Sequence, residues 1–338
     1  MNPHWRSFLE SAEGLFDGDS TELLSFGDAA GELQAAKQHT VVVPLTHLAL
    51  IEATGEDAKS FLHSQLTSDV NHLGNGQAQH AGWCTAKGRM QASFLTWQRD
   101  GRYFLALSAD LQEATQKRLQ MFVLRAKVKL SALTDSTVML GISGPQANEA
   151  LADAGLPCPD APLATAQQDE TTVIRLDASR LIVIAPESAM AALWQKLTIK
   201  ARPAGTLAWR WLDIQAAFPL VTLATKEEFV PQMADFEKIG GVSFHKGCYP
   251  GQEVVARTQY LGKVKRHLYR LTSEQALKAG DVLHSPDNPD QSCGMVMTAA
   301  ASPAGGYEAL AVVQSNFSGN LRLGTLDGPK VSAAAVNP

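Results

Sequence analysis

The spacing of apolar positions predicts two similar strand–turn–helix units in the first half of the chain. Residues 47–54, HLALIEAT, alternate in polarity as a half-buried strand does, and Gly55 ends the pattern. An apolar strand followed by Gly144 repeats this arrangement 89 residues later. The apolar positions expected on the two buried helix faces are Ala58, Phe61, Leu62 and Leu66, and then Ala147, Ala150 and Leu151. This weak repeat indicates two related α+β lobes.

Each unit is followed by a strand hairpin and a further helix. In the first lobe, the expected segments are strand-like runs at 82–98 and 102–108, a helix at 111–124 and a strand at 126–133. In the second lobe, they are strands at 171–177 and 181–186 and a helix at 187–199. This order is roughly ferredoxin-like. Residues 205–218 form one more amphipathic helix.

The last hundred residues have a different pattern of short strands separated by turn sequences such as PDNPD and PAGG. Such regular spacing is typical of a small antiparallel barrel or sandwich. The sequence therefore predicts an α+β protein with two ferredoxin-like lobes and a C-terminal antiparallel β-barrel. The expected domains are 1–136 (N-terminal segment and first lobe), 137–243 (second lobe) and 244–338 (the KGCYPGQE loop and the barrel).

Composition narrows the class of protein. The 338 residues are 45% hydrophobic and 19% charged, with a net charge of −5, which argues against bulk electrostatic binding to nucleic acid or anionic lipid. No apolar run approaches the length of a membrane span, and the polar, acidic N-terminus does not resemble a secretory signal. We therefore expect a cytoplasmic protein.

The cysteines and histidines do not suggest a metal centre. Cys84, Cys158, Cys248 and Cys293 are scattered, no CxxC occurs, and the nine histidines lack ligand spacing. We expect neither a disulfide framework nor a metal site, and four scattered thiols are typical of a reducing compartment.

Residues 244–257, FHKGCYPGQEVVAR, are the strongest candidate for chemistry. Tyr249-Pro250-Gly251-Gln252 has the residues of a type II turn, with a helix expected to begin near Gln252. Cys248 therefore lies on a tight loop beside Lys246, where a nearby cation would favour the reactive thiolate. The alternative is structural: Cys248 as a small buried hydrophobe and Lys246 as a surface charge.

Positive charge is concentrated in and after this loop. The basic residues between 246 and 270 are Lys246, Arg257, Lys263, Lys265, Arg266 and Arg270, against one acid, Glu253. An anionic ligand, either a polycarboxylate or a phosphate chain, is one interpretation. A solvated barrel strand would explain the later part of the run equally well.

The motif KGCYPGQE resembles the signature of the YgfZ family, a folate-binding group related to the T-protein (aminomethyltransferase) of the glycine cleavage system. TGEDAKSFLHSQLTSDV, AKGRM, FPL and FVPQM also occur in the family's order, so the resemblance covers most of residues 45–270. It implies a three-domain ring like the T-protein fold, with a terminal β-barrel. It also implies a cytoplasmic protein that binds tetrahydrofolate and maintains iron–sulfur clusters in enzymes, including enzymes that modify tRNA.

The resemblance also implies a set of site residues. Cys248 and Lys246 would be the reactive pair, and Trp209 would contact folate, although a core residue of an amphipathic helix is the alternative interpretation. A second folate-contacting tryptophan aligns with Leu48, which cannot stack as an indole does. Tyr249 and Arg257 complete the expected folate-binding set.

One departure from the T-protein pattern bears on activity. Gln91 and Ala92 occupy the places of an acidic pair that includes a catalytic carboxylate in T-proteins. Neither side chain can act as a general base, so glycine-cleavage chemistry is not expected.

The leading hypothesis is a folate-dependent accessory protein for iron–sulfur enzymes. The alternatives are a tetrahydrofolate-dependent one-carbon transferase and a direct tRNA-binding protein, although strong nucleic-acid binding is not expected from the net charge.

Overall fold

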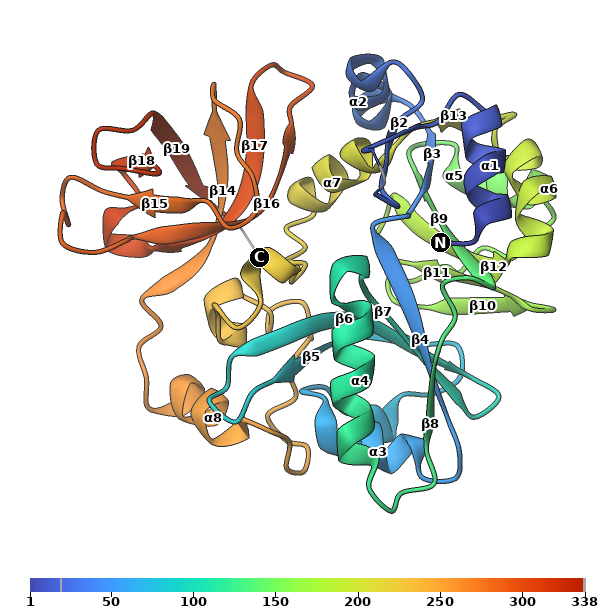
Figure 1. The fold of residues 1–338 in the computed structure, drawn as a ribbon, viewed down its shortest axis with the longest axis horizontal. Helices are drawn as coiled ribbons and strands as arrows, with labels where there is room; N and C mark the ends of the chain where they lie inside the picture. The colour runs from blue at the N-terminus through green and yellow to red at the C-terminus, as the bar shows by residue number, and fades with distance from the viewer. Residues whose placement is uncertain (19, 337–338) are drawn as a thin grey trace. The chain divides into compact units, whose positions relative to one another are not determined.

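The computed structural model describes residues 1–18 and 20–336, and the chain divides into two compact units. Unit 1 consists of Met1–Ala58, His72–Gln79 and Leu95–Trp209, and unit 2 consists of Lys59–Asn71, His80–Phe94 and the chain from Arg210 onward. Figure 1 shows the elements of both units in chain order.

Unit 1 contains a six-stranded sheet with one face covered by helices. Its order is β10 (Thr165–Gln168), β11 (Thr171–Arg175), β12 (Arg180–Pro186), β9 (Thr137–Ser143), β3 (Val41–Pro44) and β13 (Arg202–Pro203). Helices α1 (Pro3–Ser11), α5 (Ala147–Asp153) and α6 (Glu187–Leu197) pack on it, and α1 lies beside α6 (Figure 1). Trp5, Leu151 and Trp194 from these helices share one apolar core with the strands, which stabilises the layered arrangement.

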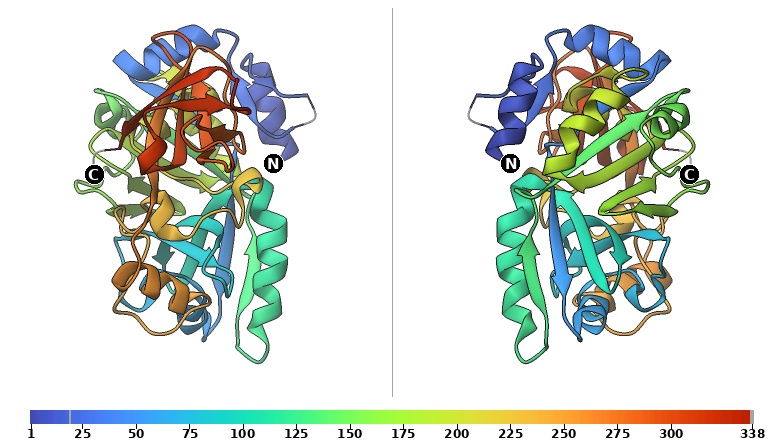
Figure 2. Two further views of the ribbon diagram at one scale, coloured as in Figure 1. Left: turned by 90° about the vertical axis from the view of Figure 1, so that its left-hand side faces the viewer. Right: turned by 90° about the vertical axis from the view of Figure 1, so that its right-hand side faces the viewer.

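A second sheet has the order β5 (Ala78–Cys84), β6 (Met90–Arg99), β7 (Arg102–Ser108), β4 (Leu48–Thr54) and β8 (Lys129–Ala132). Within unit 1, α4 (Gln112–Val123) runs along β8 (Figure 2). The predicted hairpin about residues 99–101 is confirmed. The strand-like run at 82–98 is not one strand, because a turn at residues 85–89 separates β5 from β6.

The two matched glycines occupy equivalent turns. Gly55 follows β4 at φ +115°, and Gly144 follows β9 at φ +124°, a backbone region that favours glycine. A Cβ atom at Gly55 would lie 2.0 Å from the carbonyl oxygen of Lys127, and one at Gly144 would lie 2.3 Å from that of His39. The seven apolar positions expected from the sequence are all buried: six lie on the following helices, α3 (Ala58–Gln65) and α5, and Leu66 directly follows α3. The repeat is therefore structural.

Unit 2 contains the C-terminal barrel. Six antiparallel strands close it in the order β14 (Arg266–Ser273), β17 (Tyr307–Gln314), β16 (Gly294–Ala301), β15 (Val282–His284), β18 (Leu321–Leu323) and β19 (Lys330–Ala335). Its apolar core includes Leu271, Val296 and Ala311. The predicted α+β fold with a C-terminal antiparallel barrel is confirmed.

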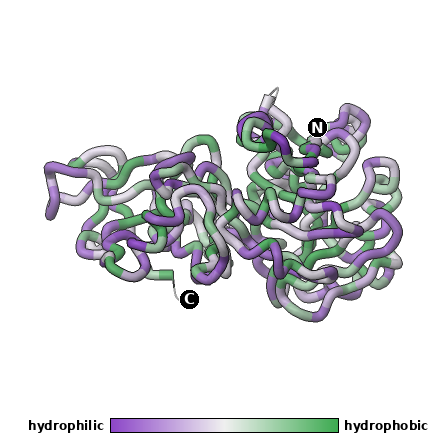
Figure 3. Tube along the Cα trace, turned by 90° about the horizontal axis from the view of Figure 1, so that it is seen from below, coloured by the Kyte–Doolittle hydropathy of each residue, from purple (hydrophilic) through white to green (hydrophobic). Residues whose placement is uncertain are grey.

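The remaining elements are short. They are β1 (Leu15–Phe16), β2 (Leu23–Ser25), α2 (Ala29–Gln38), α7 (Thr206–Gln215), α8 (Gln252–Tyr260) and the 3-10 helices Val70–His72, Ala109–Leu111, Leu223–Thr225, Pro231–Ala234 and Ser315–Phe317. Apolar and polar segments alternate along the trace (Figure 3). In the described part of the chain, no helix has the length and apolar character needed to cross a membrane.

Candidate functional site

The KGCYPGQE loop forms the turn that its sequence predicts. Gly251 lies at φ +81° and ψ +2°, and the Gln252 amide donates to the Tyr249 carbonyl at 3.2 Å. These are the features of a type II turn, in which the third residue needs a positive φ. Helix α8 begins at Gln252, as expected. The turn therefore holds Cys248 immediately before a helix.

The turn between β5 and β6 packs against this loop within unit 2. A Cβ atom at Gly251 would lie 2.3 Å from the carbonyl oxygen of Thr85 and 2.7 Å from Cα of Gly88. Gly88 itself lies at φ +73°, and a Cβ atom there would lie 3.0 Å from Cβ of Val254 on α8. The two backbones approach as closely as glycine permits, so the loop position depends on residues about 165 positions away in sequence.

Lys246 anchors the loop to the end of helix α3. Its side chain is buried at 8% exposure, and Nζ donates to the carbonyl oxygens of His63 and Leu66. These carbonyls lie at the C-terminal end of α3, where a cation is favourable. Nζ also lies 4.9 Å from the centre of the Tyr249 ring. Lys246 thus has a defined structural contact, in contrast to the surface position considered from the sequence.

Burial controls the charge of this lysine. Loss of hydration lowers the pKa of Lys246 from 10.5 to about 8, while the negative charges of Asp69 and Cys248 act in the opposite direction. The two carbonyl acceptors also favour the ammonium form, but they do not outweigh burial. Asp69 in turn lies 3.3 Å from the His63 ring nitrogen, so a small polar network surrounds the amine.

Stability should therefore depend on pH through Lys246. The unfolded chain holds this proton up to about pH 10.5, whereas the folded chain releases it near pH 8, so burial costs free energy below pH 8 and this cost disappears between pH 8 and 10.5. The free energy of unfolding of the wild type, relative to Lys246→Met, should rise by roughly 3 kcal/mol across that window. Urea denaturation at several pH values measures the difference. A difference independent of pH would contradict the lowered pKa.

The four cysteines differ in accessibility. Cys248 is exposed, Cys158 is partly buried, and Cys84 and Cys293 are buried. Burial raises the pKa of the Cys84 thiol to about 12. Cys158 Sγ lies 3.2 Å from the Arg175 guanidinium within unit 1. Of the four thiols, only Cys248 combines exposure with a conformationally restricted loop.

The residues expected to bind folate are distributed over both units. In unit 1, Trp209 is 1% exposed, and its ring packs on Gly141 and lies 5.7 Å from the Arg180 guanidinium. Leu48 begins β4 and lines a cavity of about 30 Å³ whose lining does not include Trp209. In unit 2, the buried Tyr249 contacts Lys246, and the exposed Arg257 lies on α8. Their role in folate binding stays a prediction.

Two buried amides in unit 2 have unused hydrogen-bonding capacity. Gln91 on β6 is 3% exposed and Gln232 is 1% exposed. The side-chain oxygen of each has no hydrogen-bond partner among the described residues, while Gln232 Nε2 donates to the Val255 carbonyl at 2.8 Å. A buried acceptor without a partner is costly unless a ligand or water supplies a donor. Gln232 is not among the site residues predicted from the sequence, although it lies in the segment FVPQM.

Comparison with known proteins places these features in a family. The family model described as the GCVT N-terminal domain matches residues 19–240. The tRNA-modifying protein YgfZ of Klebsiella pneumoniae is 30% identical over 253 residues, covering 74% of this chain and 77% of that protein. The tRNA-modifying protein YgfZ of Sodalis glossinidius is 31% identical over 303 residues, covering 88% and 92%.

The fold is also found in a solved structure. The glycine cleavage system aminomethyltransferase T from Bartonella henselae matches with a TM-score of 0.82 at 20% identity, covering 100% of this chain and 97% of that one. At this identity the likeness shows the fold alone. Together with the sequence matches, it shows that the chain belongs to the YgfZ-like family of tRNA-modifying proteins, which carries the GCVT N-terminal domain and is related to the glycine cleavage T-protein.

Proposed function

We propose that this chain is a tetrahydrofolate-binding accessory protein that acts in tRNA modification by supporting iron–sulfur clusters in client enzymes. The observation that carries the proposal is the presentation of Cys248. It is the exposed thiol of the four, and the type II turn at Gly251 and the anchor at Lys246 hold its loop in place. Such a loop offers a thiol to a partner without requiring the protein to unfold.

The chemistry of a thiol suits this role. A thiolate is a nucleophile and also the ligand that iron–sulfur clusters use most often. Lys246 lies two residues before Cys248 and fixes the loop that carries the thiol, because its ammonium group donates to the carbonyl oxygens of His63 and Leu66. In this proposal the Cys248 thiol is the reactive group, and Lys246 is the residue that positions its loop.

The residues present also fit a folate. The pterin ring of tetrahydrofolate carries N–H donors, and the unpaired oxygens of Gln91 and Gln232 are buried acceptors for such groups. In the same unit, Tyr249 is the aromatic candidate for its rings and Arg257 is a candidate for its carboxylates, whereas Trp209 belongs to unit 1 and is tested separately. Bound folate would supply a one-carbon carrier.

One-carbon transfer is the second candidate function. It is favoured by the fold shared with an aminomethyltransferase. The residues at the positions expected for the acidic pair, Gln91 and Ala92, are buried on β6 and offer no carboxylate. A transfer reaction would need its acid or base from another residue, so the accessory function has the stronger support.

Folate binding tests the proposal in solution. Titration of the purified chain with tetrahydrofolate in a calorimeter should show saturable binding. Replacing Trp209 by phenylalanine should weaken the affinity roughly fivefold, because a smaller ring loses about 1 kcal/mol of stacking. Trp194→Phe, in the apolar core of unit 1, is the matched control and should bind as the wild type does. Absence of binding would contradict the folate role, and equal affinities of both variants would remove Trp209 from it.

A further inference from the structure

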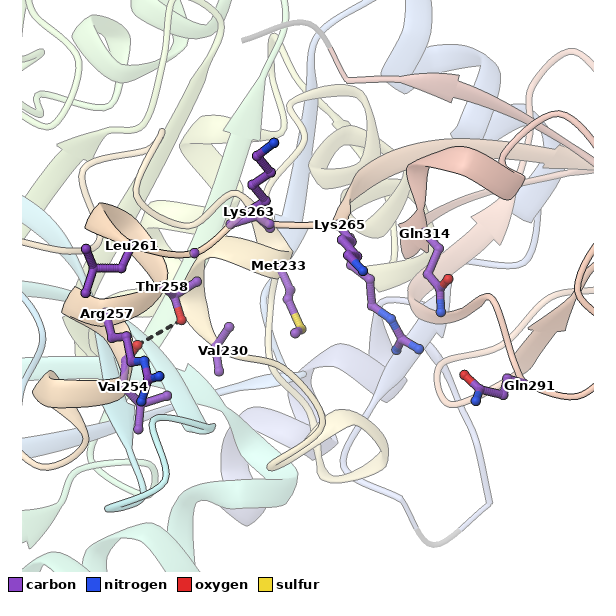
Figure 4. Close-up of a pocket in the computed structure, with 13 residues that line it drawn as sticks. Val230, Met233, Val254, Arg257, Thr258, Leu261, Lys263, Lys265, Gln291 and Gln314 are labelled. Atoms are coloured by element: carbon purple, nitrogen blue, oxygen red, sulfur yellow. Dashed lines mark hydrogen bonds between the residues drawn. The ribbon is translucent and has the colours of Figure 1, made fainter.

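A broad basic groove lies within unit 2, apart from the anchors of the Cys248 loop. Its volume is about 780 Å³. Its polar lining includes the cations Arg257, Lys263, Lys265 and Arg266 and the amides Gln291 and Gln314. In Figure 4, Arg257 projects from α8, Gln291 and Gln314 come from the barrel side, and Lys265 lies between them.

We propose that this groove binds the sugar–phosphate backbone of single-stranded RNA. Four cations line it, whereas no acidic residue does so in the part of the chain that the structure describes. None of Arg257, Lys263 or Lys265 forms an ion pair with a described carboxylate, and Arg266 donates only to the Ser292 carbonyl, at 3.4 Å. Clustered cations that lack ion-pair partners repel one another. An anionic ligand that bridges them removes this repulsion without first breaking an ion pair of the protein.

The size and surface of the groove favour a polymer over a small anion. A single phosphate would contact only part of a groove of 780 Å³, whereas successive phosphates of a strand could reach all four cations. Val254 and Leu261 add apolar surface, and Leu261 is 84% exposed. Amide side chains can hydrogen-bond base edges, and apolar surface can cover base faces.

An exposed aromatic residue that directly precedes a groove residue in the chain supports RNA in particular. Tyr260 is 65% exposed and immediately precedes Leu261. Phe244 contacts its ring edge-on at a centroid distance of 6.1 Å, which restrains the ring while leaving it accessible. Bases of single-stranded RNA can stack on such a ring, an interaction that lipid headgroups do not make. The relatives named tRNA-modifying proteins make RNA a reasonable partner.

The expected affinity of the groove for single-stranded RNA is moderate. The chain has a net charge of −5, and Glu253 and Asp290 lie close in sequence to the groove residues, so long-range attraction is limited. We expect a dissociation constant in the micromolar range, on the order of non-specific nucleic-acid binding. This is compatible with the absence of strong nucleic-acid binding expected from composition.

Fluorescence anisotropy with a labelled single-stranded oligoribonucleotide tests the proposal. With four phosphates neutralised, the logarithm of affinity should fall with the logarithm of salt concentration at a slope of roughly −3. The double variant Lys263→Ala/Lys265→Ala should reduce this slope to roughly −1.5 and weaken binding to every sequence similarly. The matched control, Lys278→Ala/Lys330→Ala, removes two exposed lysines of unit 2 that do not line the groove and should behave as the wild type.

Tyr260→Ala separates RNA from other polyanions. It should weaken RNA binding several-fold while leaving binding of inorganic tripolyphosphate unchanged. Equal RNA affinity of the Lys263→Ala/Lys265→Ala variant and its control would overturn the proposal. Binding to vesicles containing phosphatidylglycerol, or to poly-γ-glutamate, without binding to RNA would also overturn it. Tetrahydrofolate affinity should be unchanged in these variants, so this proposal and the folate proposal can fail separately.

Discussion

Iodoacetamide is expected to modify Cys248 of the native protein first, at a rate at least ~100-fold higher than for Cys84 or Cys293. Cys248 is exposed, whereas the other two react only after local or global opening. A factor of 100 corresponds to an opening free energy of only about 3 kcal/mol, which is modest for a buried strand residue. Burial also raises the pKa of Cys84 to about 12, so little thiolate exists at neutral pH. A time course by peptide mass spectrometry measures all four rates.

Cys158 is the internal control for this experiment. It is partly buried, and its sulfur lies 3.2 Å from both the Arg175 guanidinium and the Asn148 side-chain oxygen. Its limited access should keep this site slower than Cys248. If Cys158 reacted before Cys248, the loop would not be presenting the principal thiol of the chain.

Replacing Gly251 by alanine is expected to destabilise unit 2 by roughly 2–5 kcal/mol. Part of the cost, about 1–2 kcal/mol, is the left-handed backbone that alanine tolerates poorly. The remainder is a collision, because the new Cβ would lie 2.3 Å from the Thr85 carbonyl oxygen and force the two turns apart. The midpoint of urea denaturation should fall, and alkylation of Cys248 should change as its loop shifts.

Gly324→Ala is the matched control for this variant. Gly324 lies at φ +74°, close to the +81° of Gly251, but a Cβ atom added there would meet no other atom within 4 Å. It should therefore show the backbone cost of about 1–2 kcal/mol without the collision. Equal losses in the two variants would show that the contact with Thr85 does not hold the loop.

The local features of the fold could be predicted from the sequence because they depend on neighbouring residues. The Pro250-Gly251 pair determines the type II turn, and the helix after it begins at Gln252 as expected. The periodic apolar positions of α3 and α5 are buried, and both strand-ending glycines have a positive φ. Propensity and periodicity act over a few residues, so these predictions needed no knowledge of the remaining chain.

Contacts between distant segments could not be predicted in this way. Strand β3 precedes β4 in the chain, yet it pairs with β9 in the other sheet. Lys246 donates to carbonyl groups 180 and 183 residues earlier, and nothing in the local sequence indicates the end of α3 as its partner. The turn at residues 85–89 interrupts a run that appears continuous in the sequence, and it packs against Gly251, about 165 residues later. Such contacts depend on tertiary packing, and the pattern of apolar and polar residues within one segment does not determine them.

The candidate site likewise combines features that follow from the local sequence with features that depend on contacts between distant segments. Exposure of Cys248 follows from its glycine-rich turn, whereas the burial of Lys246 and its lowered pKa follow from packing against α3. The positions of Leu48 and Trp209 came from resemblance alone, and their folate contacts stay predictions. The unpaired oxygens of Gln91 and Gln232 become apparent only once the surrounding chain is in place.

The claim that the Cys248 thiol supports tRNA modification can be tested in cells that lack the gene for this chain. Plasmids would supply the wild type, Cys248→Ser or Cys158→Ser at matched protein levels, and mass spectrometry would quantify modified nucleosides in total tRNA. We expect the wild type and Cys158→Ser to restore the modification that depends on iron–sulfur enzymes, whereas Cys248→Ser should give the level of the empty vector. Full restoration by Cys248→Ser would contradict the claim and leave the thiol a structural group.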